Sequence, residues 1–165
     1  MRAITLSRTK YTYTGKAKKP AVTVIFSGKK LKANTDYTVK YSNNIAAGRA
    51  KVTITGKGSY KGAVVKYFKI LPAKQKIKAV TPLTRSFAVA WTKDSGVTGY
   101  QVMYGTKSDL SDGKSAYVTK NTSVKKTIKG LKAKKTYYVK VRSYKKVGNS
   151  KYYGAWSATQ KVKTK

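Results

Sequence analysis

Residues 136–142, Thr-Tyr-Tyr-Val-Lys-Val-Arg, alternate between apolar and polar side chains. Successive side chains of a β-strand point to opposite faces, so Tyr137, Val139 and Val141 are expected to face a core. One apolar and one polar face are typical of an antiparallel sheet with one face in solvent. The side chains expected to face outward are Tyr138, Lys140, Arg142 and, just beyond the run, Tyr144.

The same alternation recurs in other short runs along the whole chain. They lie at 37–41, 52–54, 87–91 and 100–104, and Gly, Asn and Ser separate them. Tyr (14 residues), Val and Thr are abundant, and these residues favour strands. We find no helical period, so the sequence predicts an all-β protein built as a sandwich or barrel.

A domain boundary is expected near residues 71–74, Leu-Pro-Ala-Lys. Pro72 cannot donate a hydrogen bond to a central ladder, and the alternation restarts after it. A length of 165 residues allows two small domains. We therefore predict two β-sandwich domains in tandem, residues 1–71 and residues 72–165.

Several segments after residue 72 share one pattern. They are Ser86–Trp91, Gly99–Tyr104, Gly130-Leu131, Thr136–Arg142 and Gly154–Ser157. Together they resemble a fibronectin type III domain. The resemblance implies that Trp91 is the core residue of strand B and that Gly154–Ser157 begins strand G. Leu131 and Tyr137 have the spacing of the tyrosine corner, whose hydroxyl bonds to the loop backbone. Ala133 departs from the family, which often has a loop Pro there.

A second set of segments lies in the first half of the chain. They are Tyr13–Lys16, Lys19–Val24, Asp36–Asn44, Ala47-Gly48, Val52–Gly58 and Tyr60–Gly62. They resemble the immunoglobulin-like β-modules repeated in surface and secreted proteins of Gram-positive bacteria. Such modules act as spacers, stalks and sometimes binders, so the resemblance implies an extracellular location, at the bacterial cell surface or secreted.

Some Gram-positive β-modules cross-link a Lys to an Asn side chain with the help of a buried acid. Asp36 is the only acid in the first half, and Asn34, Asn43 and Asn44 are near it in sequence. The alternative is that all four serve turns, because Asp bonds to nearby backbone and Asn tolerates a positive φ. We favour the turn interpretation.

The composition argues against an enzyme. The chain has no Cys, His or Glu, so it lacks a thiolate nucleophile, an imidazole base and the commonest transition-metal ligands. The segment Asp109–Gly113 is the nearest to a calcium loop, but it has too few oxygen ligands and no closing Glu. No single Ser–Lys pair stands out as a hydrolase site. We predict no catalysis, no cofactor and no metal, and a hairpin turn at Asp109–Gly113.

The charge is the strongest pointer to a partner. Lys plus Arg is 38 and Asp plus Glu is 4, so the net charge is 38 − 4 = +34. A surface of one sign attracts polyanions, and an excess of Lys over Arg favours diffuse attraction over bidentate recognition. We expect binding to an anionic polymer or glycan, such as wall teichoic acid or a sulfated glycan. Host-protein binding, non-specific nucleic-acid binding and a passive stalk stay open as alternatives.

Three further expectations concern the chain as a whole. No apolar run approaches the ~18 residues that span a bilayer, so we expect no membrane insertion. No secretory signal precedes the first strand-like run, so an exported protein would contain this chain as a fragment. Self-repulsion favours a monomer.

The candidate binding strip lies on the outward face of the second half. The run Tyr153–Ser157 is similar to a relaxed Trp-Ser-x-Trp-Ser element of cytokine-receptor type III domains, in which basic and aromatic side chains interleave. Such a stack either covers Trp156 or forms a strip that binds sugars or bases together with phosphate or sulfate. The candidate residues are Tyr138, Lys140, Arg142, Tyr144, Tyr152 (or Tyr153) and Trp156, with the turn lysines Lys132, Lys134 and Lys135.

Overall fold

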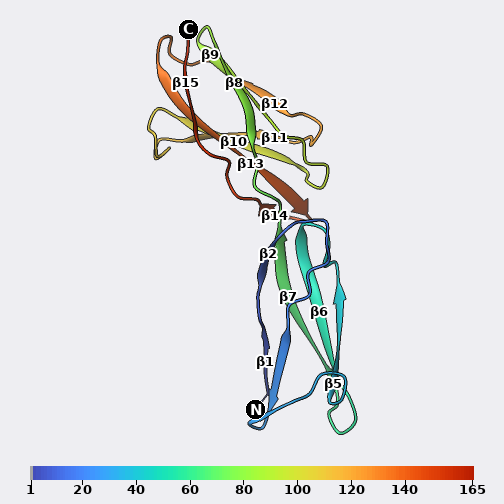
Figure 1. Ribbon diagram of the computed structural model, residues 1–165. Coiled ribbons are helices and arrows are strands. Elements are labelled where there is room, and N and C mark those ends of the chain that lie inside the picture. The colour runs from blue at the N-terminus through green and yellow to red at the C-terminus, as the bar shows by residue number, and fades with distance from the viewer. Residues whose placement is uncertain (1) are drawn as a thin grey trace. The chain divides into compact units, whose positions relative to one another are not determined.

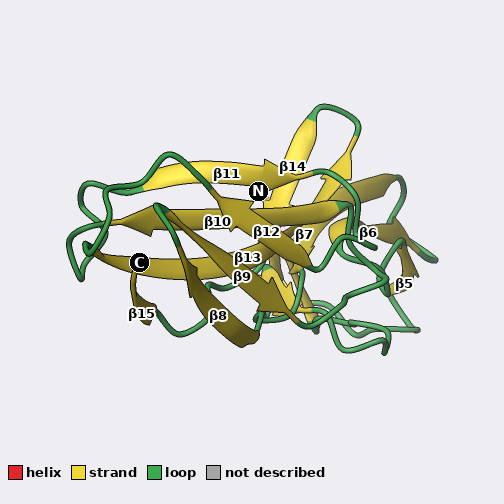
Figure 2. Ribbon diagram, turned by 90° about the horizontal axis from the view of Figure 1, so that it is seen from above, coloured by secondary structure: helices red, strands yellow, loops and turns green. Residues whose placement is uncertain are grey.

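β-Strands are the only regular elements in residues 2–165, the part of the chain that the computed structural model describes (Figures 1 and 2). The all-β prediction is therefore confirmed. Those residues contain no helix of the length and apolarity needed to cross a membrane. The chain divides into two compact units, Met1–Leu71 and Pro72–Lys165.

The first unit consists of a three-stranded and a four-stranded sheet. The three-stranded sheet has the order β1 (Arg2–Leu6), β3 (Val22–Phe26), β4 (Lys29–Lys30). The four-stranded sheet has the order β2 (Lys10–Thr12), β7 (Ala63–Leu71), β6 (Gly48–Gly56), β5 (Tyr37–Ser42). Neighbouring strands are antiparallel except β2 and β7, which are parallel.

The core of the first unit follows from the alternation along β6. Ala50, Val52 and Ile54 are 0, 0 and 3% exposed, and Phe68 and Ile70 of β7 pack with them. The residues between them in β6 are charged or polar and face away from this core, as period-two alternation requires.

The acid and asparagines of the first unit occupy turns. The Asp36 carboxylate accepts the backbone N–H of Lys32 at 2.7 Å. Asn34 and Asn43 have φ angles of 67° and 54°, a region that Asn tolerates better than most residues. The Asp36 contact and the φ angles of Asn34 and Asn43 are those of turn residues, as the turn interpretation expects. Asn44 is the exception, because it has no positive φ and donates its side-chain N–H to the carbonyl of Lys18, 26 residues away.

The second unit also consists of two sheets. One has the order β12 (Lys125–Ile128), β9 (Ser86–Trp91), β8 (Ile77–Leu83). The other has the order β11 (Lys114–Val118), β10 (Gly99–Gly105), β13 (Thr136–Val147), β14 (Ser150–Tyr153), and β15 (Gln160–Lys163) also pairs with β13. All pairs are antiparallel, which fits one buried and one outer face per sheet.

The predicted core residues of the second unit lie between its sheets. Trp91 and Tyr100 are fully buried, and their ring centroids are 5.2 Å apart. The tyrosine corner forms as expected, because the Tyr137 hydroxyl accepts the backbone N–H of Lys132 at 3.1 Å. The Trp91 indole nitrogen is the one buried side-chain polar atom within residues 2–165 that has no hydrogen-bond partner.

The expectation that strand G begins at Gly154–Ser157 is right only in part. Gly154 and Ser157 donate their backbone N–H groups to the Ser143 and Val141 carbonyls of β13, but the regular strand starts at β15. The last strands are β14 and β15, and residues 154–159 between them form no strand. The Ser157 hydroxyl accepts the N–H of Val141 at 3.0 Å, so a side chain replaces a backbone acceptor and interrupts the ladder. A Cβ on Gly154 would lie 2.8 Å from the Ala73 carbonyl oxygen, so the backbone at residues 72–73 leaves no room for a side chain at this position.

Candidate functional site

The candidate site lies on the outer face of the sheet that contains β10 and β13. Arg142 pairs with Gln101, and Lys140 pairs with Met103. Alternation places Tyr138 on the same face, and Tyr138, Lys140 and Arg142 are each half-buried. The sequence therefore assigned these three side chains to the correct face.

Four side chains on this face form a cation–π stack, in the order Lys140, Trp156, Arg142, Tyr153. The Lys140 ammonium lies 5.1 Å from the Trp156 ring centroid, and the Arg142 guanidinium lies 4.3 Å from it. The same guanidinium lies 3.9 Å from the Tyr153 ring centroid. The expected contact of Lys140 and Arg142 with Trp156 is thus present, and Arg142 has an aromatic neighbour on either side.

A hydrogen-bond chain fixes the orientation of Arg142. Its Nε donates to the Gln101 side-chain oxygen at 2.8 Å, and the Gln101 amide donates to the Ser115 hydroxyl at 2.9 Å. Burial lowers the pKa of Arg142 from its ordinary value, but a guanidinium stays charged in proteins. Gln101 is 4% exposed, and sequence analysis missed it because a lone Gln in an alternating strand gives no signal.

The prediction that Tyr144 is an outward, accessible residue is wrong in part. Tyr144 lies on the outer face but is 3% exposed. The rings of Tyr117 and Tyr153 lie 6.0 Å from its ring, and the Lys151 ammonium lies 5.3 Å from it. These neighbours come from β11 and β14, so Tyr144 is buried under side chains that the local sequence of β13 does not reveal.

The choice of Tyr152 as a site residue is also wrong, and Tyr153 takes that role. In the hairpin of β13 and β14, Tyr153 pairs with Tyr144, while Tyr152 pairs with Lys145. Neighbouring residues of a strand face opposite ways, so Tyr152 points away from the stack. The Tyr153 hydroxyl lies 3.3 Å from that of Tyr117. Burial, followed by this hydrogen bond, raises the pKa of Tyr153.

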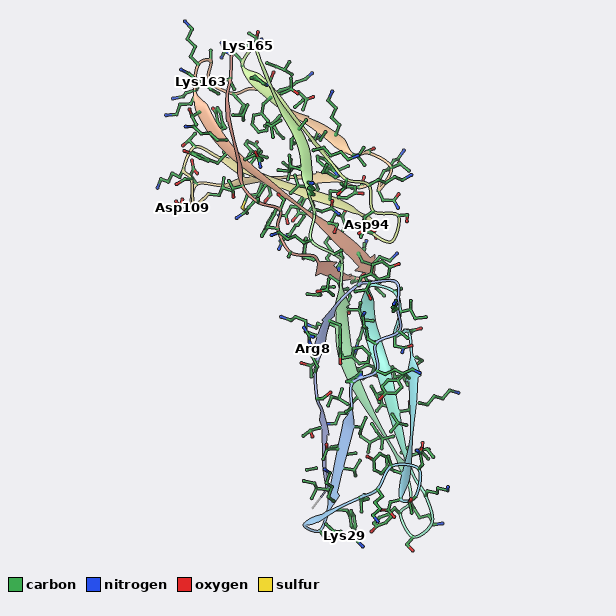
Figure 3. The ribbon with its side chains drawn as sticks, in the orientation of Figure 1. Arg8, Lys29, Asp94, Asp109, Lys163 and Lys165 are labelled. Atoms are coloured by element: carbon green, nitrogen blue, oxygen red, sulfur yellow. The ribbon has the colours of Figure 1, made fainter. Side chains whose placement is uncertain are left out.

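The turn lysines divide between two places. Lys134 and Lys135 line a hollow of about 350 Å³ together with Lys161 and Lys163 of β15. Figure 3 labels Lys163 on that strand. Lys132 does not line this hollow and lies at a neighbouring one. Sequence analysis missed Lys161 and Lys163, because only the pairing of β15 with β13 brings them here.

The two aspartates of the β10–β11 loop serve that loop. Asp112 accepts the backbone N–H and hydroxyl of Thr106 and the backbone N–H of Lys107. These bonds, led by the Thr106 hydroxyl, lower the pKa of Asp112 to about 2. Asp109, labelled in Figure 3, accepts the N–H of Ser111, which lowers its pKa. The segment is a turn between strands, as predicted.

The other two aspartates are used in the same way. Asp94 accepts the N–H of Gly96 at 2.9 Å, and Asp36 accepts that of Lys32. In residues 2–165 the backbone hydrogen bonds to the four Asp side chains come from amides of the turns in which they lie. These carboxylates therefore stabilise turns.

One of the hollows of the first unit has a volume of about 390 Å³. Its walls include Ile4, Val24 and Phe26, and the only ionisable side chains among its lining residues are those of Asp36, Tyr37, Tyr60 and Lys61. No group of three or more His, Cys, Asp or Glu that could hold a metal occurs among the residues described. The hollow offers no activated nucleophile or metal ligand set.

The comparisons with known proteins concern the second unit most directly. The sequence signature of the fibronectin type III domain matches residues 72–160. No curated protein matches the chain.

Among solved structures, a two-domain fibronectin type III segment of chicken tenascin is similar at 18% identity, with a TM-score of 0.56. That similarity covers 73% of this chain and 67% of the tenascin chain. The FN1–FN3 domains of chicken CNTN1 are 20% identical with a TM-score of 0.49, covering 72% of this chain and 42% of theirs, so this chain spans less than half of that structure. Through its second unit, the chain belongs to the fibronectin type III family, whose domains generally serve as binding or spacer modules and are typically non-catalytic.

Proposed function

We propose that this chain is a non-enzymatic module that binds anionic polymers through its lysine-rich surface. The observation that carries the proposal is the excess of cations over carboxylates. The chain has 38 Lys and Arg residues against four Asp residues, so the net charge is +34 even when every carboxylate is counted as neutralising one cation. The neutralising charge must then come from outside the chain.

The physics of such a surface favours a polymer over a small anion. Exposed charges are screened within about 8 Å at physiological salt, so each lysine acts on the anionic group nearest to it. A polymer with regularly repeated charges meets many lysines at once and releases many counterions. Lysine is a compact, flexible cation that suits this kind of contact. We propose wall teichoic acid or sulfated and acidic glycans as the class of partner.

We further propose that the chain comes from a surface or secreted protein of a Gram-positive bacterium and works outside the cell. The support is the resemblance of the first unit to immunoglobulin-like surface modules, carried by segments such as Asp36–Asn44 and Val52–Gly58. Its two-sheet architecture is compatible with that class. A wall polymer is then the polyanion that the protein meets first.

The test is retention of the chain on polymers that differ only in charge. Dextran sulfate and neutral dextran share a backbone, and purified wall teichoic acid adds the phosphate polymer. We expect retention on both polyanions at low salt, none on neutral dextran, and release by 1 M NaCl. Equal retention on neutral dextran, or no retention on either polyanion, would overturn the proposal.

Two other partners give different results in the same assay. A host glycoprotein or immunoglobulin bound through a specific interface would stay bound in 1 M NaCl, unlike a partner held by charge alone. Duplex DNA shares the electrostatics, so it should bind without sequence preference and be displaced by wall teichoic acid. DNA that resists such displacement would favour nucleic acid as the partner.

A further inference from the structure

The outer face of the second unit carries a hollow in which four lysines converge, Lys134, Lys135, Lys161 and Lys163. We propose that this hollow, termed the lysine cradle, is a discrete site for the sulfate or phosphate ester groups of an anionic glycan polymer. The inference rests on the proposed function and specifies where on the second unit the polymer binds. It implies that the polymer prefers this place to the rest of the lysine surface.

Strand pairing fixes the backbone positions from which the four lysines of the cradle project. Lys161 and Lys163 lie on β15 opposite Tyr138 and Thr136 of β13. Tyr138 and Thr136 also line the hollow. Lys161 and Lys163 are two residues apart on one strand, so their side chains leave the same face of the sheet.

Lys134 and Lys135 come from the turn before β13, and Thr164 fastens this turn. The Lys135 N–H donates to the Thr164 hydroxyl at 3.1 Å, and the Thr164 N–H donates to the Lys135 carbonyl at 3.1 Å. The Thr164 hydroxyl lies 2.6 Å from the Lys132 carbonyl. Thr164 is 3% exposed, so the backbone that carries two of the lysines is tied to the strand that carries the other two.

The groups that line the cradle are suited to an oxyanion. Four ammonium groups are donors only, and the Thr136 and Tyr138 hydroxyls add two more donors. The Asp112 carboxylate lies next to the hollow, because it accepts the hydroxyl and the N–H of Thr106, which lines it. That carboxylate is already bound by three donors, so it competes poorly for the lysines.

The cradle is open to solvent, so an oxyanion that is part of a polymer can enter it. Its volume is about 350 Å³. A water molecule takes about 30 Å³ of liquid, so the hollow holds a sulfate or phosphate ester with part of its sugar or polyol and several waters.

A polymer that leaves the cradle along β13 meets more positive charge. Lys140 and Arg142 follow Tyr138 on the same face, at steps of two residues or about 6.7 Å. The cation–π stack holds both cations against Trp156, so they are ordered before a ligand arrives. The Trp156 ring is occupied by these cations, so we assign the stack to positioning charge and not to stacking on a sugar.

The experiment compares two variants of the full chain with the same net charge. The cradle variant carries Lys134→Gln, Lys135→Gln, Lys161→Gln and Lys163→Gln. The control variant carries Lys74→Gln, Lys78→Gln, Lys93→Gln and Lys120→Gln, which change four exposed lysines of the same unit that do not line the hollow. Both lower the net charge from +34 by four. Trp fluorescence and the unfolding midpoint check that each variant is folded.

Binding is measured by calorimetry at 50 mM salt with two probes, a heparin octasaccharide for sulfate and a glycerol phosphate oligomer for phosphate. We expect the cradle variant to lose at least tenfold in affinity for one or both probes, and the control variant no more than about threefold. The probe with the larger loss identifies the oxyanion.

Three other outcomes would overturn either the cradle proposal or the proposed function. Equal losses in the two variants would overturn the cradle and leave the diffuse lysine surface as the binding device. If the unmodified chain binds neither probe, the proposed function itself fails. If the cradle variant loses affinity for duplex DNA but not for either probe, the cradle serves nucleic acid and the glycan proposal is overturned.

Discussion

The guanidinium carbon of Arg142 lies 4.3 Å from the ring centroid of Trp156, although the two residues belong to different segments of the chain. The same side chain also contacts Tyr153 and donates to Gln101. Arg142 therefore links β10, β13, the end of β14 and the irregular segment that follows it. Removing the Arg142 side chain should therefore lower the stability of the second unit as well as its positive charge.

Substitution Arg142→Ala should lower the free energy of unfolding of the second unit by about 2 kcal/mol. Each cation–π contact contributes about 0.5–1 kcal/mol at an exposed site, and a hydrogen bond from a charged group contributes about 1.5–3 kcal/mol before solvent screening. Urea unfolding followed by Trp fluorescence measures this loss, because both Trp residues of the chain, Trp91 and Trp156, lie in the second unit.

Arg142→Lys is the matched control for that loss. Lysine keeps the charge and part of the contact with Trp156, but it cannot reproduce the planar guanidinium between two rings. We expect Arg142→Lys to lose about half as much unfolding free energy as Arg142→Ala. If Arg142→Ala is as stable as the unmodified chain, the stack does not stabilise the fold.

The tyrosine corner gives a second test. Tyr137→Phe removes the hydroxyl that accepts the Lys132 N–H, and should cost about 1 kcal/mol of unfolding free energy, the usual net value of such a bond. Tyr138→Phe, one residue along on the outer face, is the control and should be close to neutral. Urea unfolding of both variants checks the difference, and equal losses would contradict the role of the Tyr137 hydroxyl.

The fold could be predicted because its signals are local. Alternation at Tyr137, Val139 and Val141 identifies a strand and its buried face, and the spacing of Leu131 and Tyr137 identifies a tyrosine corner. The start of strand G could not be placed, because the Ser157 hydroxyl replaces a ladder bond to Val141, sixteen residues away. No local pattern reports a contact of that kind.

The candidate site could be predicted only in part, for the same reason. Lys140, Arg142 and Trp156 follow from alternation and a short motif. The choice between Tyr152 and Tyr153 depends on the register of the β13–β14 hairpin, and the burial of Tyr144 depends on Tyr117 from β11. Pairing between distant strands decides these positions, and a single sequence does not give it.

Acid should weaken the β10–β11 loop through Asp112. Hydrogen bonds lower the pKa of this carboxyl from 3.8 to about 2, so its ionised form is favoured in the folded state. The stabilisation is then present above about pH 4, the unfolded value, and is lost as the pH falls through about 2. Urea unfolding between pH 5 and pH 2 should show a falling stability that Asp112→Asn flattens.

A direct check is the titration of the Asp112 carboxyl carbon by NMR. A midpoint near 2 supports the hydrogen-bonded loop. A midpoint near 4, or an unfolding curve of Asp112→Asn as steep as that of the unmodified chain, would show that the loop does not bind the carboxylate in solution.

Gly99 tests the close packing around Tyr144. A Cβ at this position would collide with the Val118 carbonyl oxygen and lie 3.1 Å from the Tyr144 hydroxyl. Gly99→Ala should therefore cost about 2–3 kcal/mol, as overpacking does.

Gly148→Ala is the control for that substitution. Gly148 has a φ of 56° and open space around its Cβ position, so only backbone strain of about 1 kcal/mol is expected. Chemical denaturation of the two variants measures the unfolding free energy that each substitution costs. If Gly99→Ala costs no more than Gly148→Ala, β10 and β11 do not pack as closely as described.

The central claim is that the positive charge of this chain is left for an external polyanion, because four carboxylates cannot neutralise 38 cationic side chains. The most direct measurement is the affinity of the full chain for wall teichoic acid as a function of salt. If about six phosphates are neutralised and each releases counterions as in duplex DNA, the affinity should fall about 10³-fold between 50 and 200 mM salt, linearly on a log–log plot. An affinity that changes less than twofold over that range would contradict the claim.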